Sequence, residues 1–457
     1  MAPAPHLAAY VEAERDRIVA SLFDWLRIPS ISAEPGRASE VAASASFCAG
    51  LLREAGFEHV ERLETPGAPA VYGDWLHAGA GAPTVLIYGH HDVQPVDPVD
   101  LWTSPPFAPV IVDGECLARG AIDDKGQTLY QIEAARALRS EGSLTVNVKF
   151  LVEGEEEVGS PHFEDLLVRH RERLGCDVVV VSDTSMISPE IPSICVSMRG
   201  LVAFDVTVRT STIDLHSGTW GGTVPNAAVV AARLVASLHD ASGRVTLPGF
   251  YDRVQPLGAG EQASLDAQPF DEAEFMAQAG VRALTGEAGR SPLERTGARP
   301  TAEVVGLTSG YGGVGIKTIV PACANFKVAF RLVADQRPDE VAQQFHTWLD
   351  TRVPPGVDVS VEAAGAVAPA ATPVDHPAMA SLVHAIETVW GTTPLFTREG
   401  GSGPEEALGR VLDAPVLFLG VGLPGDRIHA PNERMVMAQF WKGLLAAGEL
   451  LIELGLR

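Results

Sequence analysis

The stretch L-V-E-G-E-E-E-V-G-S, from Leu151 to Ser160, follows Thr145 to Phe150, a segment whose pattern is typical of a strand entering a core. The strand therefore ends in a run of glutamates. Such a run is usually a solvated surface, but the ligands of open α/β sheets bind beyond the carboxyl ends of strands. Adjacent carboxylates also repel one another unless a cation lies between them. The stretch predicts either an exposed acidic turn or part of a metal site.

The composition limits the class of protein. With 457 residues the chain is too long for one compact core, which predicts two domains. A net charge of −24 argues against nucleic acid or an anionic membrane as a partner. The five cysteines include no C-x-x-C pair, which argues against a disulfide framework and a thiolate zinc site. No apolar run is long enough for a membrane span, and acidic residues interrupt Met1 to Ser32, so we expect a cytoplasmic enzyme.

Two other apolar segments also end in polar residues that bind metals. Pro83 to Tyr88 is typical of a buried strand and leads into His90, a candidate ligand, with Asp92 placed to accept the other N–H of its imidazole. Asp177 to Val181 is a further apolar strand, and Asp183 follows it. The alternatives are a satisfied histidine in a turn and an aspartate that caps a turn. Imidazole with carboxylates suits zinc, manganese or cobalt.

Asp123 precedes a predicted helix that ends near Arg139. An aspartate at this position is commonly the N-cap of the helix. The sequence R-G-A-I-D-D-K-G, with two aspartates after a glycine-containing turn, leaves room for a bridging carboxylate instead. Just before this motif, Ile111 to Ala118 is predicted as one strand.

After Gly200 the pattern changes to alternating strands and amphipathic helices. Their order predicts a small α+β layer of the β-α-β-β-α-β kind, inserted into the larger domain. We therefore expect a catalytic domain in two parts, 1–200 and 369–457, and a lid or dimerisation domain, 201–368. The predicted strands are Leu201–Arg209, Thr301–Thr308, Ala324–Leu332 and Val357–Ala363, and the predicted helices are Pro225–Leu238 and Pro338–Thr351.

Seven short motifs together resemble the dinuclear metallopeptidase family of aminoacylases, carnosinases, glutamate carboxypeptidases and desuccinylases. The resemblance implies an α/β catalytic domain of the zinc-exopeptidase type, with a mixed, mainly parallel sheet flanked by helices, and an inserted ferredoxin-like lid. The motifs are G-H-H-D-V-Q-P (Gly89 to Pro95), R-G-A-I-D-D-K-G (Arg119 to Gly126), E-G-E-E-E-V-G-S (Glu153 to Ser160), S-D (Ser182, Asp183), D-L-H-S-G (Asp214 to Gly218), R-E-G-G-S (Arg398 to Ser402) and H-A-P-N-E (His429 to Glu433).

The resemblance also implies roles for these residues. His90, Asp123 and Asp183 would hold one divalent ion. The second ion would be held by Asp123, which bridges, together with Glu157 and His429. Glu156 would be the general base, Asp92 would orient His90, and the Asp123–Asp124 peptide bond would be cis. Zinc is the expected metal, with manganese or cobalt as alternatives.

The lid residues follow from the same resemblance. His216 resembles a histidine that reaches the neighbouring subunit's active site, which implies a homodimer; the alternative is a surface histidine. Arg331 resembles an arginine that binds the substrate carboxylate, with backbone donors at Gly401 and Ser402. Relatives often carry isoleucine where this chain has Gly403. The chain therefore departs from the family pattern at a position that shapes the carboxylate pocket.

In the family that the chain resembles, aspartate at the position of Asp183 goes with aminopeptidases and dipeptidases, and D-L-H-S-G also resembles the carnosinase and nonspecific dipeptidase branch. We therefore predict a dipeptidase that acts on small peptides with a free carboxylate. The nearest alternative is an N-acyl amino acid deacylase or desuccinylase. An inactive scaffold homologue and a dinuclear phosphoesterase are more distant alternatives.

Overall fold

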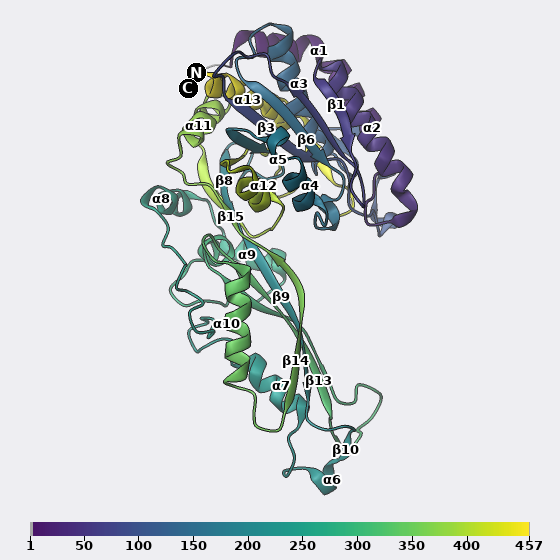
Figure 1. Ribbon diagram of the computed structural model, residues 1–457, viewed down its shortest axis with the longest axis vertical. Helices are drawn as coiled ribbons and strands as arrows, with labels where there is room; N and C mark the ends of the chain where they lie inside the picture. The colour runs from purple at the N-terminus through teal and green to yellow at the C-terminus, as the bar shows by residue number, and fades with distance from the viewer. Residues whose placement is uncertain (1–2, 457) are drawn as a thin grey trace. The chain divides into compact units, whose positions relative to one another are not determined.

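The computed structural model describes residues 3–456, and the chain divides into two compact units (Figure 1). Unit 1 contains the described residues up to Val196, Thr372–Thr397 and those from Gly403 on. Unit 2 contains Ser197–Ala371 and the short segment Arg398–Ser402. The chain passes between the units four times: within β8 (Ser193–Met198), directly after β15 (Ala370–Ala371), within β16 (Leu395–Glu399), and between Ser402 and Gly403.

The centre of unit 1 is a six-stranded mixed sheet in the order β1-β2-β6-β3-β7-β17. The pairs β6–β3, β3–β7 and β7–β17 are parallel, whereas β1–β2 and β2–β6 are antiparallel. This mixed sheet with flanking helices confirms the predicted fold class. The strands are β1 (Glu58–Leu63), β2 (Ala70–Trp75), β3 (Thr84–His90), β6 (Asn147–Glu153), β7 (Val178–Val181) and β17 (Val416–Phe418).

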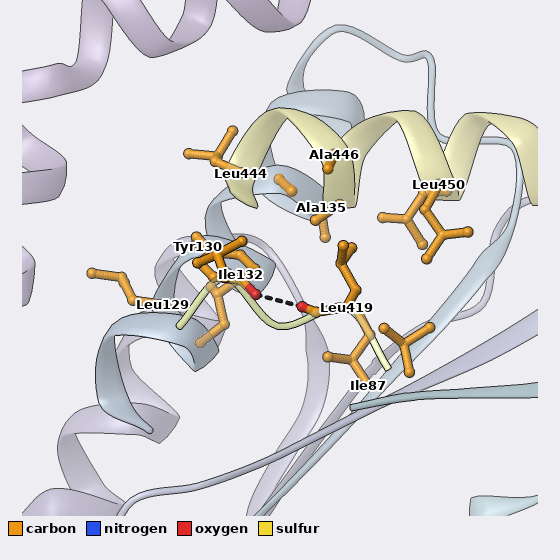
Figure 2. Packing of buried hydrophobic residues seen from close by; sticks show 14 of the residues in the cluster. Ile87, Leu129, Tyr130, Ile132, Ala135, Leu419, Leu444, Ala446 and Leu450 are labelled. Atoms are coloured by element: carbon orange, nitrogen blue, oxygen red, sulfur yellow. Dashed lines mark hydrogen bonds between the residues drawn. The ribbon is translucent and has the colours of Figure 1, made fainter. Parts of the chain in front are cut away.

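Helices cover both faces of this sheet because its central strands are apolar on both sides. In β3, Val85 and Ile87 join the large core formed with α1, α2, α3, α11 and α13, and Figure 2 shows part of that packing. Tyr88 faces the other way and packs edge-on against Phe163 of α4, with ring centroids 5.4 Å apart. The helices are α1 (Pro5–Leu26), α2 (Ala38–Glu54), α3 (Lys125–Ser140), α4 (Phe163–Arg169), α5 (Arg171–Leu174), α11 (Pro377–Trp390), α12 (Glu405–Leu412) and α13 (Met437–Gly455).

Helix α3 is buried along almost its whole length, so its polar side chains need internal partners. The Tyr130 hydroxyl donates to the Leu419 carbonyl at 2.6 Å (Figure 2), and Gln127 accepts the main-chain N–H of Val421 at 2.9 Å. Gln131 donates to the Ser182 hydroxyl at 2.6 Å. These bonds hold the helix that follows Asp123 in one position against the sheet.

The single strand predicted from Ile111 to Ala118 is wrong. The segment forms a hairpin of β4 (Val110–Val112) and β5 (Glu115–Leu117), which pairs further with β18 (Arg434–Val436). Asp113 and Gly114, with φ angles of 51° and 83°, make the turn. Asp-Gly is a strong signal for a two-residue hairpin, because both turn positions need positive φ.

Unit 2 is built on a four-stranded antiparallel sheet in the order β11-β13-β9-β14. Helices α7 and α10 cover one face, where Phe204 stacks on Phe345 with centroids 4.7 Å apart. The chain order is β-α-β-β-α-β, as predicted. The elements are β9 (Gly200–Arg209), β10 (Leu215–His216), α6 (Ser217–Trp220), α7 (Ala227–Ala236), α8 (Ala259–Ala267), α9 (Glu272–Ala279), β11 (Thr301–Ser309), β12 (Ile319–Val320), β13 (Cys323–Leu332), α10 (Pro338–Asp350) and β14 (Asp358–Val367).

Within residues 3–456, none of the helices has both the length and the apolar character that a membrane crossing requires.

Candidate metal centre

Three neighbouring parallel strands of unit 1 bring polar side chains to one edge of the sheet. The strands β6, β3 and β7 are adjacent and run in the same direction. His90 is the last residue of β3, Glu156 and Glu157 follow β6 in a short 3₁₀ turn, and Asp183 follows β7. Because the carboxyl ends of parallel strands meet at the same edge, residues from distant parts of the chain converge there.

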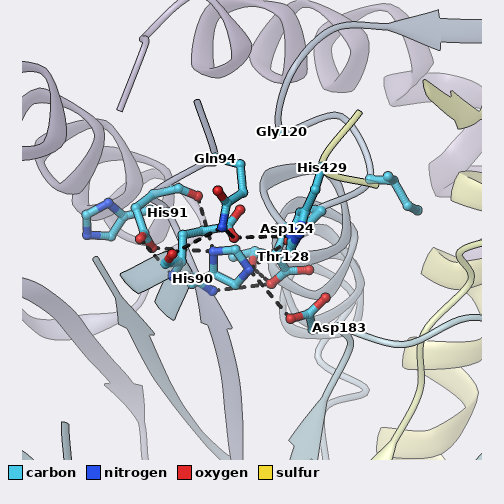
Figure 3. A network of polar contacts seen from close by, with 12 residues as sticks. His90, His91, Gln94, Gly120, Asp124, Thr128, Asp183 and His429 are labelled. Carbon is cyan, nitrogen blue, oxygen red and sulfur yellow. Dashed lines mark hydrogen bonds and ion pairs between the residues drawn. The ribbon is translucent and has the colours of Figure 1, made fainter. Parts of the chain in front are cut away.

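The carboxylate of Asp123 lies between two imidazoles. Its Oδ1 atom is 3.0 Å from Nε2 of His90, and its Oδ2 atom is 2.9 Å from Nε2 of His429. One carboxylate thus presents one oxygen to each ring nitrogen, an arrangement suited to bridging two cations. The Oδ2 atom of Asp183 lies 3.6 Å from Nε2 of His90, and Figure 3 shows this ring and this carboxylate turned toward each other.

Glu157 and Glu156 complete two compact groups of ligand-type atoms. The Oε2 atom of Glu157 is 3.2 Å from Nε2 of His429. Atoms of His90, Asp123 and Glu157 lie within 4.8 Å of one another, and so do atoms of His90, Glu156 and Asp183. Glu156 is therefore as close to the imidazole as a ligand would be.

The protonation of the cluster reflects crowded carboxylates. Burial, reinforced by neighbouring carboxylates, raises the pKa of Glu156 to about 10 and that of Glu157 to about 7. Hydrogen bonding to Asp123 and Glu157 raises the pKa of His429 to about 10. Burial alone would lower the pKa of His90, but Asp123 and Asp183 outweigh it and hold that pKa well above its usual value. Without a cation, protons must neutralise this cluster.

The side chains of the cluster fit divalent ions. Among residues 3–456, the buried Oε1 atom of Glu157 has no hydrogen-bond partner, and the buried Nε2 atom of His90 faces carboxylate oxygens of Asp123 and Asp183 at 3.0 and 3.6 Å. A buried ring nitrogen of this kind, surrounded by carboxylate oxygens, is the donor set that zinc and similar ions accept. Cations in place of protons would also let both glutamates ionise.

Asp92 connects two members of the cluster. Its Oδ2 atom accepts the main-chain N–H of Glu157 at 3.1 Å, and its Oδ1 atom lies 3.4 Å from Nδ1 of His90. The closer acceptor for that Nδ1 atom is the main-chain oxygen of Asp92, at 3.1 Å. Gln94 donates to Oε2 of Glu157 at 2.8 Å. The neighbouring His91 points away and bonds to the Pro69 carbonyl at 2.9 Å (Figure 3).

Glu433 braces the loop that carries Asp123. It is fully buried, and its Oε1 atom accepts the main-chain N–H groups of Ile122 and Asp123 at 3.0 and 3.2 Å. Its Oε2 atom accepts from Gly120 N–H at 3.0 Å and from the buried Arg119 guanidinium at 2.7 Å. Sequence reasoning missed this role, although both Arg119 and Glu433 lie in the quoted motifs.

The second aspartate of the D-D pair, Asp124, was also missed. Its Oδ2 atom accepts the His90 main-chain N–H at 3.2 Å and the Thr128 hydroxyl at 2.9 Å (Figure 3). Asp124 is the N-cap residue of α3, but its side chain makes no capping bond. The Asp123–Asp124 peptide bond is cis, as expected from the resemblance.

The other predicted site residues belong to unit 2. His216 is exposed on β10, and its Nδ1 atom accepts the Gly218 N–H at 3.0 Å. Nη1 of Arg331 donates to the Ser402 hydroxyl at 3.0 Å, and that hydroxyl donates to the Arg199 carbonyl at 2.5 Å. Gly401 lies in the same turn.

Gly403, the departure noted in the sequence, lies in unit 1. A Cβ atom at this position would lie only 2.6 Å from the carboxylate of Glu405, which is itself buried. The carboxylate therefore fills space that a side chain at position 403 would need.

A sheet with carboxylate and imidazole side chains at its carboxyl edge, together with an inserted α+β layer, is typical of metallopeptidases. Comparison with known proteins agrees with this class. The model of peptidase family M20/M25/M40 matches residues 86–453, so the chain belongs to that family.

Among curated relatives, the Beta-Ala-His dipeptidase of Homo sapiens is 28% identical over 464 residues, covering 97% of this chain and 91% of the relative. The Cys-Gly metallodipeptidase dug1 of Schizosaccharomyces pombe is 28% identical over 452 residues, covering 95% and 94%. These relatives confirm the predicted family and its dipeptidase branch. They also confirm the predicted class of enzyme, a metallopeptidase.

The solved structures of similar proteins agree. The M20 family metallo-carboxypeptidase Sso-CP2 from Sulfolobus solfataricus superposes with a TM-score of 0.84 at 30% identity, covering 96% of this chain and 99% of that one. Human carnosine dipeptidase 1 superposes with a TM-score of 0.77 at 28% identity, covering 100% of both chains.

Proposed function

We propose that this protein is a metal-dependent dipeptidase that hydrolyses the peptide bond of small peptides with a free carboxylate. The observation that carries the proposal is Asp123, whose two oxygens face the Nε2 atoms of His90 and His429 at 3.0 and 2.9 Å. Such an arrangement suits a pair of divalent ions sharing one carboxylate. The names of the relatives, both dipeptidases, support the substrate class.

The proposed ligands divide into two sets. Asp123 belongs to both, since each of its oxygens faces a different histidine. The first ion would be held by His90, Asp123 and Asp183, and the second by Asp123, Glu157 and His429. Zinc is the proposed metal, because it binds both imidazole and carboxylate ligands. Manganese and cobalt suit the same donors.

Glu156 is the proposed general base. When bound, a pair of divalent ions would polarise the scissile carbonyl and make a water molecule more acidic. The Glu156 carboxylate would accept a proton from the attacking water and deliver it to the nitrogen of the leaving amine. Asp92 would keep the His90 ring and the Glu157 main chain in place through its contacts at 3.4 and 3.1 Å.

The roles proposed for unit 2 concern the substrate carboxylate. Arg331 would bind it with a guanidinium fork, and its hydrogen bond to Ser402 at 3.0 Å supports a fixed orientation of that side chain. Ser402 and the neighbouring Gly401 would add donors from the turn. His216 would act in the active site of a second subunit.

The proposal therefore includes a homodimer that forms through unit 2. Strand β11 is an edge of its sheet, and an unpaired edge is a site for pairing with another chain. Val304, Val305 and Leu307 on this strand are exposed, and so is Trp220 of α6. A second copy of the same chain would cover these apolar side chains. The domain limits 1–200, 201–368 and 369–457 and a cytoplasmic location also stay predictions.

A panel of substrates tests the proposed activity. The protein is stripped of metal, reconstituted with zinc or manganese, and assayed on Ala-Ala, Leu-Gly and β-Ala-His beside N-acetyl and N-succinyl amino acids. We expect cleavage of dipeptides that depends on added metal. Cleavage of the acylated amino acids alone would overturn the dipeptidase proposal and favour a deacylase. Two bound ions without any turnover would favour an inactive scaffold.

A further inference from the structure

Unit 2 contains a cavity of about 710 Å³ beside the turn that carries Ser402. It lies where the segments before β9 and before β11 meet the end of β13. Four arginines and three acidic residues line it, an unusual surplus of positive charge for a chain with a net charge of −24. The arginines are Arg199, Arg295, Arg299 and Arg331, and the acidic residues are Asp240, Glu287 and Glu303.

Two of these arginines already have internal partners. The Nε atom of Arg299 donates to Oε2 of Glu287 at 2.7 Å, and its Nη2 atom donates to Oε1 at 2.8 Å. Arg295 donates to the carbonyls of Glu287 and Thr285 at 3.1 and 3.0 Å. Both side chains therefore serve the structure of the cavity wall and are not available to a ligand.

Arg199 and Arg331 differ from this pair. In the described part of the chain, no carboxylate lies within ion-pair distance of either guanidinium. Within residues 3–456, the Arg331 side chain bonds only to the Ser402 hydroxyl, and the buried Nε atom of Arg199 has no hydrogen-bond partner. Burial and the charge of Arg331 lower the pKa of Arg199 to about 10, which shows that the two like charges oppose each other.

In the described part of the chain, none of the three acidic residues of the cavity forms an ion pair with Arg199 or Arg331. Glu287 is occupied by Arg299 and by Arg244, whose Nη1 atom is 2.8 Å from it. Asp240 accepts the main-chain N–H groups of Ser242 and Arg244 at 2.8 and 3.0 Å. Glu303 is exposed on β11, and although its charge raises the pKa of Arg199, burial and the charge of Arg331 outweigh it.

The register of the sheet brings the two free guanidiniums to one side. Arg331 pairs with Leu201 of β9, and Arg199 lies two residues before Leu201, so alternation places both on the sheet face away from the helices. A Cβ atom at Gly400 would lie 2.8 Å from Nη2 of Arg199, so this guanidinium rests against the glycine. Both arginines therefore contact the turn that ends at Ser402.

We propose that Arg199 binds a second carboxylate, the side-chain carboxylate of a C-terminal aspartate or glutamate in the substrate. The inference rests on the proposed function, in which Arg331 and Ser402 hold the α-carboxylate. A cavity of about 710 Å³ has room for such a side chain. Two unpaired guanidiniums on one turn suit a ligand with two carboxylates. The enzyme would then prefer dipeptides that end in an acidic residue.

An isosteric pair of substrates tests this preference. Ala-Glu and Ala-Gln have the same shape and differ in one charge. For the metal-loaded wild type we expect kcat/KM to be higher for Ala-Glu. We expect Arg199→Gln to reduce the Ala-Glu to Ala-Gln ratio by about 10- to 100-fold, the usual effect of removing one partner of a charge-assisted hydrogen bond. Arg199→Lys should retain part of the ratio.

Arg295→Gln is the matched control, because it also removes a cavity arginine but one that serves only main-chain carbonyls. It should leave the ratio unchanged. If Arg199 only supported the turn, its replacement would lower kcat/KM for both substrates by the same factor. Equal kcat/KM values for Ala-Glu and Ala-Gln in the wild type would overturn the inference, while the dipeptidase proposal would stand.

A binding measurement separates this inference from failure of the proposed function. Dissociation constants of both dipeptides are measured by calorimetry on metal-loaded Glu156→Gln and on the double variant that also carries Arg199→Gln. We expect Ala-Glu to bind more tightly than Ala-Gln to the first protein, and equally to the second. If no dipeptide is cleaved but this difference is found, the dipeptidase proposal fails, whereas the inference that Arg199 binds a second carboxylate stands. Equal binding of Ala-Glu and Ala-Gln to the first protein would overturn the inference about Arg199.

Discussion

The two units hold their charged clusters in opposite ways. In unit 1, buried carboxylates hold the main chain that carries the proposed ligands: Asp92 accepts the N–H of Glu157, and Glu433 accepts the N–H groups of Ile122 and Asp123. In unit 2, Arg199 and Arg331 contact a glycine-containing turn and have no carboxylate partner among residues 3–456. One cluster is negative and braced, and the other is positive and largely unpaired.

This difference matches two demands of catalysis. Groups that hold metal ions or move protons must be placed within a fraction of an ångström, so buried partners that fix them contribute to rate. Groups that choose a substrate gain from unpaired charge, because the ligand supplies the missing partner. Substitutions in unit 1 should therefore alter chemistry or metal affinity, and substitutions in unit 2 should alter the selection of substrates.

The largest effect is expected from Glu156→Gln. Removing a general base reduces kcat by about 10²- to 10⁴-fold, and a neutral amide of the same shape should leave both ions bound. The measurement is kcat on Ala-Ala together with metal content. Glu155→Gln is the control, because that side chain bonds to His162 at 2.9 Å outside the cluster. Loss of an ion in Glu156→Gln, with activity restored by excess metal, would show that Glu156 is a ligand instead.

Glu433→Gln tests whether the brace matters to the metal centre. Both oxygens of Glu433 accept hydrogen bonds from N–H groups. In a glutamine, the NH₂ group would take the place of one of these oxygens and would face N–H donors that it cannot accept. We expect the loop that carries Asp123 to shift and the affinity for metal to fall by about 10- to 100-fold. Competition with a chelator measures this affinity. Glu115→Gln, which disrupts only a partly exposed pair with Arg434, should bind metal as the wild type does.

Much of this braced cluster could be predicted because its parts lie at the ends of apolar strands. His90 and Asp183 follow buried apolar segments, and the end of such a strand can be recognised from the sequence alone. That Glu156 and Glu157 would join them followed from the same rule. The order β6-β3-β7, which makes the three strands neighbours, is what turned separate strand ends into one cluster.

The rest depends on contacts between residues far apart in the chain. Glu433 accepts the main-chain N–H groups of Ile122 and Asp123, which are more than 300 positions away in the chain, and no local sequence pattern predicts such a contact. The arginine cavity was missed for the same reason, since Arg199 and Arg331 meet only through the register of β9 with β13. The Asp113–Gly114 hairpin is different, because its turn signal was present and was not used.

Glu153 offers a test of burial in unit 1 that does not involve a proposed ligand. Burial raises the pKa of this carboxyl to about 8, although Tyr88 and Ser160 donate hydrogen bonds to it. The folded chain therefore keeps a proton that the unfolded chain loses near pH 4.5, the ordinary pKa of a glutamate side chain. Stability should fall as pH rises between these two values, by about 1.4 kcal/mol per pH unit at the steepest.

Chemical denaturation from pH 5 to pH 9 measures this slope in the wild type and in Glu153→Gln. The variant has no proton to lose at this position, so its stability should depend less on pH and should exceed the wild type's at pH 9. Parallel curves for the two proteins would contradict the assignment and place the titrating groups elsewhere, for example in the cluster around Glu157.

The smallest effect is expected from Ser402→Ala in unit 2. The hydroxyl accepts a hydrogen bond from Arg331 at 3.0 Å and donates one to the Arg199 carbonyl at 2.5 Å, so it links the two unpaired arginines. Its loss costs one ordinary hydrogen bond, about 0.5–1.5 kcal/mol. KM for dipeptides should rise by roughly 2- to 12-fold, with kcat and metal content unchanged. Ser211→Ala, which removes an exposed hydroxyl bonded to Ile213, should change neither constant. A fall in kcat for Ser402→Ala at constant KM would mean that this turn acts on the reacting groups, and the separation between a braced catalytic cluster and an unpaired selecting cluster would not hold.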